Sequence, residues 1–234
     1  MTTYLILLYY LLWFDTAEER FAAALHRELV PRLKETKGVC RIQLNIADSD
    51  VEAAAALRME NSAAAFDAMC SVYLDDTVSG ATIDKQVQAF CAQFSRYHVD
   101  EIERLPNTQH QTEAGQRTPG FSQIALLRCP RRLEYQAWLD YWQNTHTTVA
   151  LETQSTFRYV QNIVSDVAGK DVSCYHAIVE ECFPTLAMTN SEVFYNAEGD
   201  SQKQQANMKR MIDSCVNFID FDEIDVVPTS EYVY

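Results

Sequence analysis

The 234-residue sequence predicts an α+β fold built from two similar halves, each with the order strand, helix, strand, strand, helix, strand. Three observations support this prediction. Short apolar runs that suit buried strands alternate with stretches whose apolar residues recur every three or four positions, as in helices. A segment without large apolar residues, 106–120, divides the chain near its middle. Short motifs recur in the same order on both sides of this segment.

The first half, residues 1–105, begins with the apolar run YLILLYYLLWF, which suits a strand covered on both faces. The next stretch carries an apolar residue at every fourth position and ends at Gly38, which predicts a helix with a glycine at its C-terminus. The expected elements are a strand at 4–14, a helix at 17–37, strands at 39–47 and 54–60, a helix capped by Ser62, a break at 75–80, a helical piece through 87–94 and a strand at 98–105.

The second half, residues 121–234, shows the same alternation, and Gly169 marks a turn between two of its strands. The expected strands are 121–129, 157–164, 172–183 and 223–227, and the expected helices are 132–154, 190–195 and 203–219, with a break at 196–200.

Three motifs are shared between the halves: Asp-Glu-Ile at 100–102 and 222–224, Cys-x-x-Phe at 91–94 and 215–218, and Asn-Ser at 61–62 and 190–191. Each Asn-Ser pair is followed by a nearby Phe. The order of elements in each half is that of the ferredoxin-like plan, one sheet with both helices on one face. The other face of each sheet also needs cover. We therefore expect two tandem ferredoxin-like β-α-β-β-α-β repeats, joined by the linker 106–120, that form an intrachain pseudo-dimeric α/β barrel with helices outside.

The charge of the chain excludes some partners. It carries 33 Asp and Glu against 19 Lys and Arg, a net charge of −14, which disfavours binding to nucleic acid or to an anionic membrane surface. Residues 180–234 hold eleven of the acids, and we expect most of them on the outer surface.

The eleven-residue apolar run at 4–14 is too short to span a bilayer and lacks the flanks of a signal peptide. Seven cysteines without a C-x-x-C pair favour free thiols in the cytoplasm.

Several common catalytic motifs are missing. The sequence has no G-x-G-x-x-G, no Walker loop, no H-E-x-x-H and no G-x-S-x-G. The five histidines do not show metal-ligand spacing. We therefore expect neither a metal site nor a nucleotide cofactor.

The helix expected at 132–154 carries the most informative pattern. One stripe of it steps by three or four residues and directs His146 toward the sheet together with two tryptophans; its members are Tyr135, Trp138, Trp142, His146, Val149 and Ala150. Two interpretations stay open for His146. It is either a core histidine whose nitrogens are satisfied by neighbours, or a general acid or base in an aromatic pocket, since an unperturbed imidazole titrates near pH 6.5.

The motif Tyr141-Trp142-x-x-x-His146, followed by Phe157-Arg-Tyr-Val-Gln-Asn162 on the next strand, resembles the EthD family of dimeric α/β-barrel proteins. The resemblance covers about residues 124–227. The first half departs from it, with Leu25-His-Arg-Glu-Leu29 and Arg41-Ile-Gln-Leu-Asn45 at the corresponding places. The resemblance implies the same barrel fold and a small-molecule pocket between sheet and helices, as in related isomerases, cyclases, decarboxylases and cofactor-free oxygenases.

Candidate site residues follow from the motif and from strand parity. His146 is the candidate catalytic acid or base, and Trp138 and Trp142 are candidates for packing a ligand ring. Alternation along the strand places Arg158 and Asn162 on one face and Tyr159 on the other, without showing which face meets the helices. Further candidates for ligand binding are Arg158, Tyr159, Asn162 and His176, and the alternative for each is a structural role inside the barrel.

Three functions remain open at this point. The first is an enzyme that acts on a small apolar cyclic or aromatic metabolite by His-assisted proton transfer, as an isomerase, lyase or cofactor-independent oxygenase. The second is a non-catalytic ligand-binding or stress-type barrel. The third is a haem-binding barrel, since some related barrels use a histidine ligand; no other cofactor is expected. The expected partner is a small molecule. The sequence also leaves open a homodimer, in which a second copy of the chain is the partner.

Overall fold

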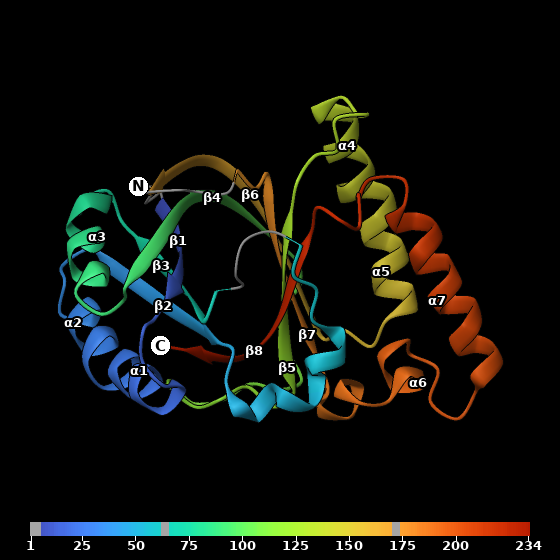
Figure 1. The fold of residues 1–234 in the computed structure, drawn as a ribbon, viewed down its shortest axis with the longest axis horizontal. Coiled ribbons are helices and arrows are strands. Elements are labelled where there is room, and N and C mark those ends of the chain that lie inside the picture. The colour runs from blue at the N-terminus through green and yellow to red at the C-terminus, as the bar shows by residue number, and fades with distance from the viewer. Residues whose placement is uncertain (1–5, 62–65, 170–173) are drawn as a thin grey trace.

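The computed structural model describes residues 6–61, 66–169 and 174–234, and within these ranges eight antiparallel strands close into a barrel (Figure 1). The order around the ring is β1-β3-β2-β8-β5-β7-β6-β4, and β4 pairs with β1 to close it. The strands are β1 (Ile6–Trp13), β2 (Val39–Ile46), β3 (Ala68–Leu74), β4 (Gln93–Leu105), β5 (Phe121–Leu127), β6 (Arg158–Gly169), β7 (Ala177–Phe183) and β8 (Asp225–Val233).

Helices lie outside the ring: α1, α2 and α3 of the first half are on one side, the helices of the second half are on the other, and η2 of the first half lies beside the second-half helices (Figure 1). The first half contributes α1 (Glu18–Ala24), η1 (Leu25–Leu29), α2 (Val30–Lys34), η2 (Ser49–Leu57) and α3 (Gly80–Gln88). The second contributes α4 (Tyr135–Asp140), η3 (Tyr141–His146), α5 (Thr147–Thr153), η4 (Thr185–Met188), α6 (Ser191–Phe194) and α7 (Ser201–Cys215). None of the helices in the described ranges has both the length and the apolar character needed to cross a membrane.

Each half of the chain supplies four neighbouring strands in the same relative order, β4-β1-β3-β2 from the first half and β8-β5-β7-β6 from the second. The two sets join through the β2–β8 and β4–β6 pairs. This architecture confirms the predicted α+β barrel with external helices. Because the ring is closed, none of the described strands offers a free edge for pairing with another chain.

The segment 106–120 runs along β8 after it leaves β4. The Gly115 amide donates to the Val233 carbonyl at 2.7 Å, and the Thr118 amide donates to the Glu231 carbonyl at 2.8 Å. Arg117 forms an isolated bridge with Tyr232. The segment expected to be a linker is therefore fixed to the barrel wall by backbone hydrogen bonds.

The prediction of a strand at 54–60 was wrong. The chain forms the 3-10 helix η2 there, and only a single bridge, from Met59 to Val226, follows within the described residues. The stretch is rich in alanine and offers little of the β-branched and aromatic surface that strands pack with. It buries Val51 and Ala54 instead.

The third strand of the first half is β3, at Ala68–Leu74. The sequence predicted a helix there, as the continuation of one that starts at Ser62. Ser62 itself lies outside the described residues. Every residue of β3 is buried. A short run that is apolar on both faces lacks the alternation that marks a strand, so its periodicity cannot separate it from a buried helix.

Some boundaries in the second half also differ from the expected ones. β6 continues to Gly169, where a turn was predicted, and β7 begins only at Ala177. The last strand extends from Asp225 to Val233, beyond the predicted end at residue 227. The last helix begins at Ser201, because the Asp200 carboxylate caps it by accepting a hydrogen bond from the Lys203 amide at 2.9 Å.

The expected surface position of the C-terminal acids was wrong for four of the eleven, which are buried: Glu180, Glu181, Asp225 and Glu231. Their neighbours in space explain three of these positions. Glu180 and Glu231 pair with Arg158 inside the barrel, and Asp225 accepts hydrogen bonds from the Asn61 amide and the Tyr175 hydroxyl. The spacing of charges along a sequence does not show such partners.

A polar network centred on Arg158 fills part of the barrel interior. The Arg158 guanidinium donates to Glu180 at 3.0 Å and to Glu231 at 2.9 Å. Glu180 also accepts hydrogen bonds from the Tyr9 hydroxyl at 2.5 Å, from Gln43 at 2.6 Å and from Asn162 at 3.1 Å. Burial alone would raise the pKa of Glu180, but Arg158 and these hydrogen bonds lower it below its ordinary value. Glu180 is therefore an ionised, fully paired structural group.

We predict that the substitution Arg158→Met strongly destabilises the fold. It removes the cation shared by two buried carboxylates, and such a loss costs about 3–5 kcal/mol in the free energy of unfolding. Urea unfolding at pH 7 measures the effect. The matched control is Arg210→Met, which breaks an exposed pair with Glu152 and is expected to cost less than about 1 kcal/mol. Equal losses in the two variants would show that the network adds no stability.

Candidate functional site

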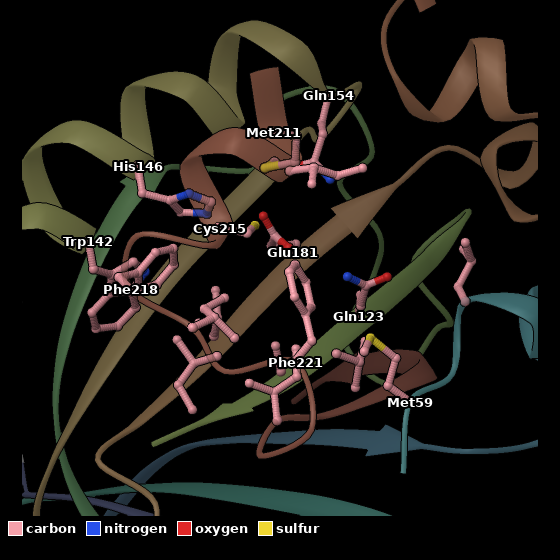
Figure 2. Close-up of a pocket in the computed structure, with 18 of the residues that line it drawn as sticks. Met59, Gln123, Trp142, His146, Gln154, Glu181, Met211, Cys215, Phe218 and Phe221 are labelled. Atoms are coloured by element: carbon pink, nitrogen blue, oxygen red, sulfur yellow. The ribbon is translucent and has the colours of Figure 1, made fainter. Parts of the chain in front are cut away.

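A cavity of about 320 Å³ lies between the helices of the second half and the outer face of its sheet (Figure 2). Most of its wall is apolar, formed by side chains that include Met59, Trp142, Met211, Phe218 and Phe221. Its polar lining side chains are Gln123, His146, Gln154, Tyr159, Glu181 and Tyr195, and the thiol of Cys215 also lines it. An apolar cavity with a few convergent polar groups is the usual form of a small-molecule site.

The π-helical segment η3 positions two of the lining residues, Trp142 and His146. Such wider turns are rare and often occur at functional sites. The Nδ1 atom of His146 lies 3.0 Å from the Ser214 hydroxyl, and its ring packs at 4.4 Å from the ring of Phe218. Burial lowers the pKa of His146 to about 4. The imidazole is therefore uncharged at neutral pH, where it can accept a proton or donate one hydrogen bond.

The two tryptophans of the sequence stripe have different positions. The Trp142 Nε1 donates to the Tyr159 hydroxyl at 3.2 Å, and both side chains line the cavity. Trp138 packs behind Trp142, with 5.7 Å between ring centroids, and its Nε1 donates to the Phe218 carbonyl at 3.0 Å. Trp138 thus supports the wall of the cavity without lining it.

Three other sequence candidates lie away from this cavity. Arg158 and Asn162 are on the face of β6 that points into the barrel, where both bind Glu180. The His176 Nδ1 accepts a hydrogen bond from the Cys129 amide at 3.0 Å, and its ring contacts Trp138. The structure therefore brings Trp142, His146 and Tyr159 together, with Trp138 and His176 behind them.

Glu181 belongs to the same cavity, although sequence reasoning did not single it out. Its carboxylate points into the pocket from β7 (Figure 2), and the residue is 8% exposed. Burial raises its pKa to about 7. A signal was available: two adjacent acids in an apolar strand must face opposite sides of the sheet, so at least one of them faces the helices.

The first half holds apolar residues at the corresponding places. In the second half Glu181 of β7 lies between two cross-strand neighbours, Gln123 of β5 and Tyr159 of β6. His146 is the last residue of the π-helix η3. The same places in β1, β3, β2 and the first π-helix are taken by Leu8, Val72, Ile42 and Leu29. These four side chains belong to one packed core. The polar groups of the cavity are therefore a property of the second half.

Among the described residues, no group of three or more His, Cys, Asp or Glu side chains is placed to hold a metal ion. The polar lining of the cavity offers an uncharged imidazole, a carboxyl group whose pKa is about 7, two amides, two phenols and a thiol.

Comparisons with known proteins agree with this architecture. Residues 130–222 match the family model described as EthD domain. An anthrone oxidase-like protein of known structure aligns over 98% of this chain and 92% of its own, with a TM-score of 0.56 and 8% identity. A candidate monooxygenase from Fusobacterium nucleatum subsp. nucleatum ATCC 25586 aligns over 99% of this chain and 94% of its own, with a TM-score of 0.52 and 9% identity. Identities this low show the fold alone.

No curated protein sequence matches the chain. The family match nevertheless includes the π-helix with Trp142 and His146, the strand with Tyr159 and the strand with Glu181. Residues 130–222, which carry most of the cavity, therefore match an EthD domain.

Proposed function

We propose that the protein binds a small, largely apolar, cyclic or aromatic molecule in this cavity and transfers a proton on it with the assistance of His146. The cavity itself carries the proposal. Its apolar walls suit a ring system, and its few polar groups suit one or two ligand heteroatoms. The corresponding places in the first half are occupied by packed apolar side chains.

The lining residues suggest distinct roles. The Trp142 ring offers a face on which an aromatic ligand can pack. The Tyr159 hydroxyl accepts a hydrogen bond from Trp142, so its own hydrogen is available to a ligand carbonyl. His146 is uncharged at neutral pH and can exchange a hydrogen bond or a proton with the ligand.

The reaction class is an isomerisation, an elimination or a cofactor-independent oxygenation, each of which can begin with removal of a proton from the substrate. The name of one structural neighbour, an anthrone oxidase-like protein, supports an aromatic ketone as substrate class, and the name of the other, a candidate monooxygenase, supports an oxygenation. A non-catalytic binding barrel differs from this proposal only in the absence of turnover.

We also infer that the chain arose by tandem duplication of a ferredoxin-like unit, with residues 1–105 as the degenerate copy, 106–120 as the linker and 121–234 as the EthD-like copy. The shared strand order supports this origin, as do the π-helical segments at Leu25–Leu29 and Tyr141–His146. We place the protein in the reducing cytoplasm, a location with which its seven free cysteines agree.

We predict that anthrone, a tricyclic aromatic ketone, quenches the tryptophan fluorescence of the protein saturably, because Trp142 lines the cavity. The measurement is a fluorescence titration of the wild type. Absence of saturable quenching would overturn the proposal of an aromatic ketone site.

We predict that His146→Ala lowers the steady-state rate of anthrone conversion by at least about 100-fold, the usual loss for a group that assists proton transfer. The matched control is His26→Ala, which changes a histidine in the other π-helix. Circular dichroism checks that both variants fold. Equal rates for His146→Ala and the wild type would remove His146 from the reaction, and binding without any turnover of the wild type would support the non-catalytic alternative.

A further inference from the structure

Two adjacent acids of β7 have opposite environments. Glu180 faces the barrel interior and accepts hydrogen bonds from four side chains, Arg158 among them. Glu181 faces the cavity, and within the described part of the chain its carboxylate has neither a hydrogen-bond donor nor an ion-pair partner. The first arrangement is that of a structural carboxylate, and the second calls for a different explanation.

An unpaired buried carboxylate destabilises a fold because ionisation in an apolar environment is unfavourable. The architecture does not require an acid at this place, since Val72 occupies the corresponding position of β3 and packs in the core of the first half. A group that lowers stability without structural need, and that points into a cavity, is a candidate for direct contact with the ligand.

The surroundings of Glu181 favour its neutral form and a neutral ligand. The side chains that face it across the cavity or beside it are His146, Gln123, Cys215 and Tyr159. His146 is uncharged at neutral pH, and burial, followed by the charge of Glu181, raises the pKa of Cys215 to about 12. None of the described residues that line the cavity is Lys or Arg. An anionic ligand would therefore find no cation here and would be repelled by ionised Glu181.

We propose that Glu181 is a catalytic residue that takes a proton from a carbon acid of a bound, uncharged aromatic ketone. The inference rests on the function proposed above. In this step the ligand C–H bond breaks, and its electron pair enters the conjugated ring and places the negative charge on the ketone oxygen. The proton forms an O–H bond on the Glu181 carboxylate. Return of that proton to the same or another carbon completes the cycle without an oxidant.

His146 assists by holding the oxygen on which the charge develops. If the Ser214 hydroxyl donates to Nδ1, the ring hydrogen is on Nε2, the nitrogen left for the ligand. Ser214 is then a positioning residue that fixes the tautomer. A hydrogen bond from an uncharged donor to a developing oxyanion in an apolar site stabilises the transition state more than it stabilises the ground state.

The first test uses anthrone in deuterated buffer without oxygen. We expect the wild type to accelerate deuterium incorporation at the central methylene of anthrone, measured by mass spectrometry. Glu181→Gln should lower this rate at least about 100-fold, while fluorescence quenching shows that anthrone still binds. Glu181→Val places in β7 the residue type that Val72 provides at the corresponding position of β3. This variant should lose deuterium exchange to the same extent as Glu181→Gln. The control Glu152→Gln changes an exposed acid and should retain the wild-type rate.

The outcomes separate the two proposals. Binding of anthrone with undiminished exchange in Glu181→Gln overturns the role of Glu181 and leaves the binding function standing. Failure of the wild type to bind anthrone overturns the aromatic ketone function and, with it, the proposed step. Loss of exchange with retained binding supports both.

The second test needs no ligand. The pKa of Glu181 in the folded protein is about 7, above the value of an unfolded glutamate, so ionisation favours unfolding as the pH rises. We expect the unfolding equilibrium constant of the wild type, relative to Glu181→Gln, to rise roughly 50-fold between pH 5 and pH 8. Urea unfolding of both proteins at each pH measures this ratio. A ratio that does not change with pH would show that Glu181 is solvated or paired, and would overturn the assignment.

Discussion

The hydrogen-bonded closure of the strand ring determines where each side chain of the barrel lies. Because the ring has an enclosed interior and is covered by helices outside, both faces of most strands are buried, and successive residues enter different environments. Glu180 and Glu181 show the consequence most directly. The first joins the Arg158 network in the interior, and the second enters an apolar cavity under the helices. One peptide bond separates a structural carboxylate from a candidate catalytic one.

The same scaffold supports two different packings. In the first half the space between helix and sheet is filled by Leu8, Leu29, Ile42 and Val72, which gives a solid core. In the second half polar side chains take the corresponding places and line a cavity. The two halves thus differ in what these places hold: the first half holds packed apolar side chains, and the second half holds polar side chains around a cavity.

The sequence predicted the order of most elements, a long helix at 132–154 without its π-helical segment η3, and the direction of His146 toward the sheet. These features depend on local periodicity, which a sequence shows. The position of β3 could not be predicted in this way, because all of its residues are buried and no alternation marks it. Nor could both partners of Arg158 be predicted, because Glu231 lies beyond the predicted end of the last strand, on β8, which does not pair with the strand of Arg158. Glu181 was missed although its adjacency to Glu180 in an apolar strand indicated that one of the two acids faces the helices.

Burial shifts the pKa values of His146 and Glu181, two titratable groups of the cavity, in opposite directions, with one electrostatic result. It lowers the pKa of His146 to about 4 and raises that of Glu181 to about 7. In both cases the uncharged form is favoured, because a medium of low polarity disfavours charge of either sign. Near neutral pH the cavity thus holds a neutral imidazole and a carboxyl group close to its midpoint. Such a pair can exchange a proton with a neutral ligand without a large electrostatic penalty, whereas an anionic ligand would lose its hydration on entry and gain no counterion in return.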